Sequence, residues 1–215
     1  MNLPVSLHKY LVRIARNLII CLMILAPLFM LSCRQSGNGQ EAVRASFNVD
    51  QSLLEKDPLT DTGLSFKMQY PAGWKMLEDA FRNRLAEQIL VGRYAPARIV
   101  GGVVHPVDSS MLIILDVSQV DSSFFLHLKE NYAVILNQDN RWLDVQLETF
   151  THHCFVVDQY VLQNENLVQF RLQCRKKEDE SLQPRMEIYF FLNRSALNEH
   201  IKSIESSIGT LNCLN

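Results

Sequence analysis

The sequence lacks the short motifs by which many enzymes are identified from a single chain. No P-loop, G-x-G-x-x-G turn or G-x-S-x-G nucleophile elbow occurs in its 215 residues. Its five cysteines are widely spaced and include no C-x-x-C pair, so they fit neither a zinc ribbon nor a thioredoxin-like motif. We therefore predict a protein that is not an enzyme and carries no cofactor.

Glycine and proline are scarce, with eight and seven residues, which argues against a fibrous or low-complexity chain. The hydrophobic fraction of 47% and the charged fraction of 20% are typical of one globular domain with a buried core. Removing the three basic residues that precede position 33 (Lys9, Arg13, Arg16) leaves 18 of 21 basic residues against 23 acidic ones, about −5. The basic run 175–177 is followed at once by the acidic run 178–180. This charge pattern argues against a nucleic-acid binder.

The N-terminal segment has the order of a secretory signal. A positively charged stretch, residues 1–16, precedes an apolar run of about 15 residues that ends at Leu31. That run is shorter than the roughly 20 residues that span a bilayer comfortably as a helix, and Pro27 interrupts it. A cleaved signal peptide is therefore favoured, and an uncleaved signal anchor is the alternative.

The end of this segment, Met30-Leu31-Ser32-Cys33, resembles the lipobox of bacterial lipoproteins. The resemblance implies cleavage between Ser32 and Cys33 and diacylglyceryl attachment to the Cys33 thiol. Residues 1–32 are then a lipoprotein signal peptide, and residues 33–62 are the acylated cysteine and a flexible tether. Arg34 is not acidic, so by the same resemblance the outer membrane is favoured, with the domain on its periplasmic side.

Residues 63–215 read as a single α+β domain. Residues 63–70 alternate apolar and polar side chains, as in a half-buried strand, and 110–117 is a continuous apolar run typical of a central strand. Further strands are predicted at 143–150, 154–162, 167–174 and 186–192, and helices at 77–89, 121–136 and 195–211, with Gly209 near the end of the last helix. Residues 92–102, with Pro96 and the Gly101-Gly102 pair, are predicted as a loop or an irregular edge. The pattern predicts an antiparallel sheet of about six strands with helices packed on its faces.

The stretch Phe66 to Trp74, an alternating strand that runs into Tyr-Pro-Ala-Gly-Trp, resembles the opening of PsbP-like domains. The closing strand and helix, residues 189–208, resemble the end of that family's domain. The resemblance implies an αβα sandwich that binds protein partners without catalysis. Pro71 is expected to stop the strand and Trp74 to fill the core.

Histidines are the candidate metal ligands. His152 and His153 are adjacent, so on a strand their rings would point to opposite faces and could not share a metal ion. His105, His127 and His200 are far apart in sequence. No metal is therefore predicted, although a site that combines histidine and carboxylate stays an alternative.

Cys154 and Cys174 flank a predicted hairpin. A three-residue loop at 163–165 would place the two residues directly opposite each other, and only that register brings their sulfurs together easily. A loop of two or four residues would instead pair Phe155 with Cys174. We predict either a Cys154–Cys174 disulfide, which an exported protein allows, or two buried thiols.

The sequence therefore predicts a lipid-anchored lipoprotein of the bacterial cell envelope that acts as a non-catalytic binding or assembly module. Its partners would be the membrane, through Cys33, and a protein. Two alternatives stay open. One is an envelope enzyme or metal-binding protein that uses His105, His127 or His152, and the other is a carrier of a lipid or small ligand in an apolar cavity between sheet and helix.

Overall fold

The computed structural model describes residues 43–125, 144–181 and 183–214. The strands are β1 (Val43–Arg44), β2 (Leu59–Asp61), β3 (Phe66–Met68), β4 (Lys75–Met76), β5 (Arg98–Val104), β6 (Met111–Asp116), β7 (Asp144–His152), β8 (Phe155–Gln163), β9 (Leu167–Lys176), β10 (Met186–Asn193) and β11 (Asn212–Cys213). The helices are α2 (Asp79–Ile89) and α4 (Leu197–Gly209), with 3-10 turns η1 (Gln51–Leu53), η2 (Gly92–Tyr94) and η3 (Arg194–Ala196).

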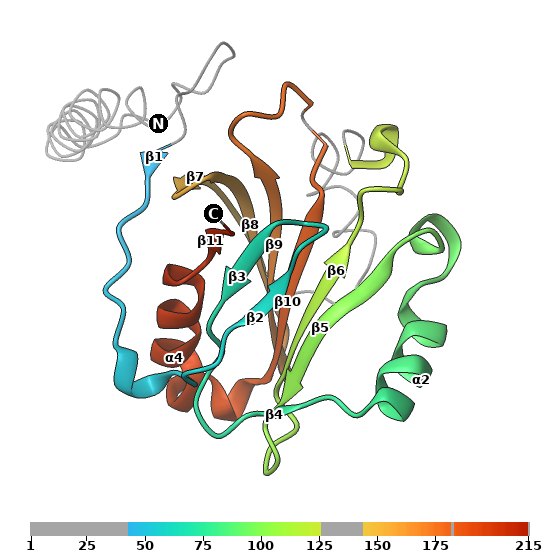
Figure 1. Ribbon diagram of the computed structural model, residues 1–215. Coiled ribbons are helices and arrows are strands. Elements are labelled where there is room, and N and C mark those ends of the chain that lie inside the picture. The colour runs from blue at the N-terminus through green and yellow to red at the C-terminus, as the bar shows by residue number, and fades with distance from the viewer. Residues whose placement is uncertain (1–42, 126–143, 182, 215) are drawn as a thin grey trace, which may run out of the picture. The chain divides into compact units, whose positions relative to one another are not determined.

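Eight strands form one sheet in the order β1-β7-β8-β9-β10-β6-β5-β4, with antiparallel neighbours except for the parallel pair β1 and β7 (Figure 1). The long strands β7 to β10 follow one another in the chain as a meander. Their β-branched and aromatic residues favour a pleated surface. The continuous apolar run in β6 is explained by its place inside the sheet, where Leu112, Ile113, Ile114 and Leu115 are all buried.

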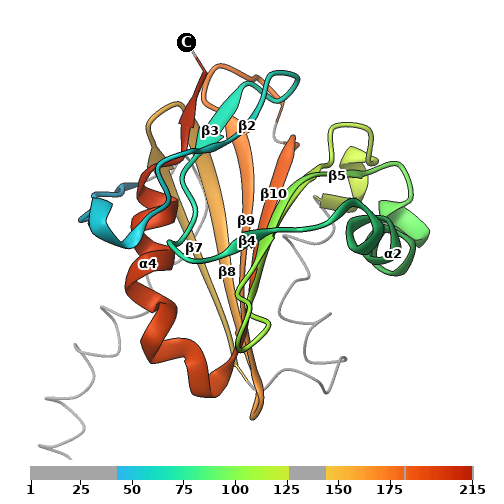
Figure 2. The same ribbon diagram turned by 60° about the horizontal axis from the view of Figure 1, so that its bottom comes forward.

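Helices α2 and α4 lie on opposite faces of the large sheet (Figure 2). Side chains of β10 alternate between two apolar clusters, because successive residues of a strand point to opposite faces. Ile188 and Phe190 join the cluster that contains Ile204 of α4. Tyr189 and Phe191 pack against the other cluster, which includes residues of α2. The expectation of an antiparallel sheet with helices packed against it is confirmed.

The protein is richer in strands than predicted. Beside the eight-stranded sheet, β11, β3 and β2 form a three-stranded sheet, where about six strands in total were expected. One missed strand is β5, since Gly101 and Gly102 had suggested a loop. The absence of a side chain has a packing reason at Gly102, where a Cβ would lie 2.5 Å from Leu77 Cδ1.

The predicted flexible tether is partly wrong. Residues 43–62 belong to the domain, because β1 extends the large sheet and β2 pairs with β3. Short strands with few apolar residues carry little sequence signal, and their pairing is decided by the surface they cover. The domain therefore begins near Val43 and not at Gly63.

Gly209 allows the N-terminal part of the domain to cross α4 closely. A Cβ at this position would lie 2.6 Å from Val49 Cγ2 and 2.7 Å from Phe47 Cβ. The Phe47 ring in turn packs edge-on against Phe150 and His152. Gly209 has no positive φ, so its role is this close approach and not the left-handed cap that often ends helices.

The predicted disulfide is wrong in its pairing. Cys154 is bonded to Cys213 of β11, with a Cα–Cα distance of 6.1 Å, and Cys174 is a buried free thiol. The register of the β8–β9 hairpin places Val157, and neither Cys154 nor Phe155, opposite Cys174. The bond joins the start of β8 in the large sheet to the last strand of the small sheet.

Candidate functional site

Two histidines and an aspartate meet where the β5–β6 loop touches α4. His105 and Asp108 lie in that loop, and His200 lies in the first half of α4, so residues almost a hundred positions apart are brought together. In Figures 1 and 2 the loop lies beside the beginning of α4. Each of the three residues offers one ligand atom, and these atoms lie within 4.8 Å of one another.

The loop conformation places Asp108 between the two rings. The His105 N–H donates to the Ser110 carbonyl at 2.7 Å, which closes the loop at its base. Asp108 Oδ1 accepts from the Ser110 N–H at 2.8 Å, a turn that aspartate forms readily. Asn193 Nδ2 donates to the Asp108 carbonyl at 2.7 Å and ties the loop to the end of β10. The carboxylate is thus held at both its backbone and its side chain.

The carboxylate of Asp108 faces both imidazoles. His200 Nε2 lies 2.6 Å from Asp108 Oδ2, and His105 Nδ1 lies 3.0 Å from Asp108 Oδ1. The first pair is a hydrogen bond. The second is close but badly directed, so the buried His105 Nδ1 has no hydrogen-bond partner among the described residues. A buried polar nitrogen in this condition is uncommon and calls for an explanation.

Trp74 forms a wall of the site. The centroid of its ring lies 5.5 Å from that of His200, in an edge-on arrangement, and 6.1 Å from that of His105. Trp74 is buried, as expected from the Tyr-Pro-Ala-Gly-Trp motif. Burial by itself would raise the pKa of Asp108, but hydrogen bonds from His200 and Ser110 outweigh it and hold that pKa well below its usual range. The site therefore presents an ionised carboxylate between two imidazoles at neutral pH.

Sequence reasoning identified only part of this cluster. The structure brings His105 and His200 together, while His127 lies outside the described residues. Asp108 was missed, although a His-x-x-Asp spacing within a short loop was a usable signal. The sequence could not show that His200 meets this loop, because only the fold brings α4 to it.

His152 is elsewhere in the molecule. It ends β7, and its Nε2 lies 3.0 Å from the Gly209 carbonyl oxygen. The expectation that His152 and His153 point to opposite faces is wrong, since their ring centroids are 4.2 Å apart. His153 has a positive φ of 46° in the turn before β8, and the alternation of a strand does not apply there.

A second polar cluster is buried on the opposite face of the sheet. Glu187 is fully buried, and its Oε1 accepts from Arg171 Nη2 at 2.6 Å and from Gln173 Nε2 at 2.7 Å. Its Oε2 accepts from the Tyr189 hydroxyl at 2.6 Å, and Arg171 also donates to the Tyr94 hydroxyl. Burial raises the pKa of both tyrosines. Both carboxylate oxygens are occupied, which is the pattern of a structural ion pair.

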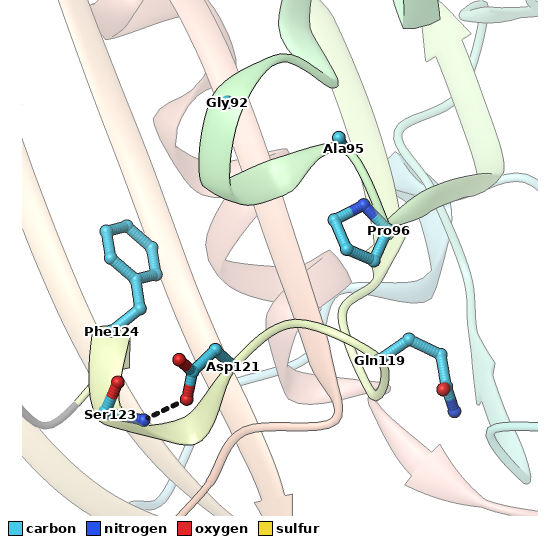
Figure 3. Close-up of a pocket in the computed structure, with 7 residues that line it drawn as sticks. All are labelled: Gly92, Ala95, Pro96, Gln119, Asp121, Ser123 and Phe124. Atoms are coloured by element: carbon cyan, nitrogen blue, oxygen red, sulfur yellow. Dashed lines mark hydrogen bonds between the residues drawn. The ribbon is translucent and has the colours of Figure 1, made fainter.

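Surface hollows are further candidate sites in the described part of the chain, and two of them are considered for a ligand. One, of about 530 Å³, lies between η2 and the segment after β6, and Figure 3 shows its lining residues. There Asp121 accepts from the Ser123 N–H at 2.9 Å, so this carboxylate begins a helix at 122–125. The other, of about 370 Å³, lies between the sheet and α4. The rest of the helix predicted at 121–136 lies outside the described residues.

The predicted lipidation and cleavage residues, Cys33 and Ser32, also lie outside the described residues. Within the described part of the chain, no helix has the length and apolar character needed to cross a membrane.

No protein-family model matches the chain, and no curated protein matches its sequence. Among solved structures, the chain is similar to the solution structure of cyanobacterial PsbP (CyanoP) from Synechocystis. The TM-score is 0.40 and the sequence identity is 9%, over 79% of this chain and 97% of that chain. This similarity concerns the course of the chain and assigns a role to no residue.

Proposed function

We propose that this protein is a lipid-anchored component of a bacterial envelope, whose PsbP-like domain binds another envelope protein without catalysing a reaction. The observation that carries the proposal is the sequence Met30-Leu31-Ser32-Cys33 after a short apolar run. A diacylglyceryl group at Cys33, joined by a further acyl chain on the new amine, would hold the chain at the membrane, because each buried methylene contributes about 0.8 kcal/mol.

The short segment between Cys33 and the domain fits this proposal. Its first strand, β1, begins at Val43, so residues 34–42 separate the anchor from the domain. A stretch of this length reaches about 30 Å at most when fully extended. The domain would therefore work close to the bilayer, within reach of other membrane proteins and of lipid head groups. The periplasmic face of the outer membrane is the proposed location.

The anchor is tested by labelling cells with a palmitate analogue and following the protein through membrane fractionation. Cys33→Ala should abolish both the label and the sedimentation with membranes, because it removes the acylated sulfur. Cys21→Ser is the matched control, since it removes a cysteine from the apolar run and leaves the lipobox intact. Labelling of Cys33→Ala at the level of the unchanged protein would refute the anchor.

The binding role is tested with the same pair of variants. Crosslinking in intact cells, followed by purification of the protein, should capture the same envelope partner with the unchanged chain and with Cys21→Ser. Cys33→Ala should lose most of that partner if proximity to the membrane contributes to binding. Equal capture by Cys33→Ala would show that the anchor has no part in the function.

A carrier of a small apolar ligand is the second candidate, favoured by the 370 Å³ groove between the sheet and α4. This volume lies within the range of small-molecule sites. Its apolar lining includes Phe47, Phe150, Phe170 and Ile201. Binding of a fluorescent fatty acid should be reduced by Ile201→Trp, which fills the groove, and unchanged by Leu147→Trp at an exposed position. Absence of binding to the unchanged protein would eliminate this candidate.

A further inference from the structure

The three donors at the β5–β6 loop are of the kinds that transition metals prefer. Imidazole nitrogen suits zinc, copper, nickel and iron, and a carboxylate oxygen is a frequent third ligand. Calcium and magnesium instead prefer sets made of oxygen donors alone. The combination of His105, Asp108 and His200 therefore selects for a borderline transition-metal ion.

The spacing of the donors is close to that of a bound ion. Donors that surround a tetrahedral zinc ion at about 2.0–2.1 Å lie about 3.3 Å from one another. The observed separations from the Asp108 oxygens are 3.0 Å to His105 Nδ1 and 2.6 Å to His200 Nε2. All three donor atoms lie within 4.8 Å of one another, so small side-chain adjustments, in which His200 Nε2 and Asp108 Oδ2 move apart, bring them to the spacing of a bound ion.

The unsatisfied nitrogen of His105 is the independent sign of a ligand. Its Nδ1 is buried and has no hydrogen-bond partner among the described residues, although a carboxylate oxygen lies only 3.0 Å away. If hydrogen bonds alone stabilised the cluster, His105 Nδ1 would point at an Asp108 oxygen, as His200 Nε2 does. A metal ion would satisfy Nδ1, because a neutral imidazole donates its lone pair along that direction.

The surroundings hold the donors in place, as the supporting contacts of metal sites do. Asp108 is fixed by the Ser110 N–H and by Asn193, and the His200 ring packs against Trp74. His105 and Asp108 keep about a fifth of their side-chain surface exposed, while His200 keeps 7%. An ion could therefore enter from the loop side and keep one coordination position open to solvent.

We propose that His105, Asp108 and His200 bind one divalent transition-metal ion, for which Zn²⁺ is the probe, and leave a fourth position for water or for a donor from a bound partner. Binding replaces the hydrogen bond between His200 Nε2 and Asp108 with two metal–ligand bonds. The proton that His200 Nε2 donates to Asp108 leaves that nitrogen, for solvent or for Nδ1, and the neutral ring that ligates the ion carries its one proton at Nδ1. The ion connects the β5–β6 loop to α4 and so stiffens one end of the domain.

The test is calorimetric titration of the full-length protein in detergent with Zn²⁺, after treatment with a chelator. We expect one ion per chain and an increase in the melting temperature. Co²⁺ in place of Zn²⁺ should give the visible absorption of a four-coordinate site and quench the fluorescence of Trp74, which lies against His200. Trp142→Phe leaves Trp74 as the single tryptophan, and quenching in this variant locates the ion at the cluster by a readout that does not depend on stability.

His105→Gln and His200→Gln should each weaken Zn²⁺ binding by at least tenfold, and His105→Gln is the safer variant because its side chain is partly exposed. His153→Gln is the matched control, since His153 is exposed and lies in a different turn. Binding that survives both His105→Gln and His200→Gln, or no binding to the unchanged protein, would overturn the proposal. Cys33→Ala should bind Zn²⁺ normally, so failure of the anchor and failure of the metal site are distinguishable.

Discussion

Removal of the Cys154–Cys213 disulfide should destabilise the domain by about 4 kcal/mol. The bond closes a loop with a sequence separation of 59 residues. In the chain-entropy account, a crosslink that closes a loop of this length removes about 4 kcal/mol of conformational freedom from the unfolded state at 25 °C. The stabilisation by the crosslink should be absent both from Cys154→Ser/Cys213→Ser and from the reduced protein.

The assay is urea unfolding of the protein with and without reductant. The oxidised protein should show the higher midpoint, and the double variant should match the reduced protein. Cys174→Ala is the control, because it removes a buried free thiol and leaves the crosslink intact, so its response to reductant should equal that of the unchanged protein. A reductant effect below about 1 kcal/mol would contradict the entropic reasoning.

The pairing itself is checked by tryptic mapping without reduction. Cys154, Cys174 and Cys213 fall in the separate peptides 142–171, 172–175 and 203–215. The structure requires a link between the first and the third, with the second alkylatable in denatured protein. A link between 142–171 and 172–175 would show that the hairpin has a different register from the one described.

Three further predictions follow from the packing. Gly209→Ala should lower the free energy of unfolding by about 1–3 kcal/mol, because its Cβ would overlap Phe47 and Val49. Ser203→Ala, at an earlier position on α4, should change that free energy far less in the same urea titration. Arg171→Met should cost about 3–5 kcal/mol, because Glu187 would be left as a buried charge, and Arg171→Met/Glu187→Met should recover part of that loss; a double variant no more stable than the single one would refute this account of the pair. The pKa of His152 is lowered from 6.5, mainly by burial and also by His153 and Lys177, so His152 contributes stability that is present above pH 6.5 and is lost as the pH falls through the lower folded-state pKa. Unfolding midpoints at pH 7.5 and 5 should therefore differ less for His152→Gln than for the unchanged protein.

Much of the sheet was predictable because its strands carry a strong pattern. Alternation in β3 placed Phe66 and Met68 inside and Lys67 outside, as the structure has them. The apolar run of β6 and the helical spacing of α4 were equally direct. In β1, β2 and β5 the residues carry no clear strand pattern, and each segment is a strand because it pairs with a neighbouring strand. Such pairing is a property of the fold and not of the segment.

The candidate metal site and the disulfide show the same limit. His105 and His200 were visible as histidines, but their meeting depends on the position of α4 against the β5–β6 loop. No partner was predicted for Cys213, and it lies next to Cys154 because β11 pairs with β3 in the small sheet. The wrong expectation for Cys174 came from the hairpin register, since Val157 lies opposite it. A shift of a few residues in register reassigns every cross-strand partner.

The central claim, that the protein is held at a membrane through Cys33, is tested most directly by mass spectrometry of the mature protein purified from envelope membranes. The account predicts an N-terminal peptide that begins at Cys33 and carries the added mass of a diacylglyceryl group. A chain that begins at Met1, or one in which Cys33 has a free thiol, would contradict it.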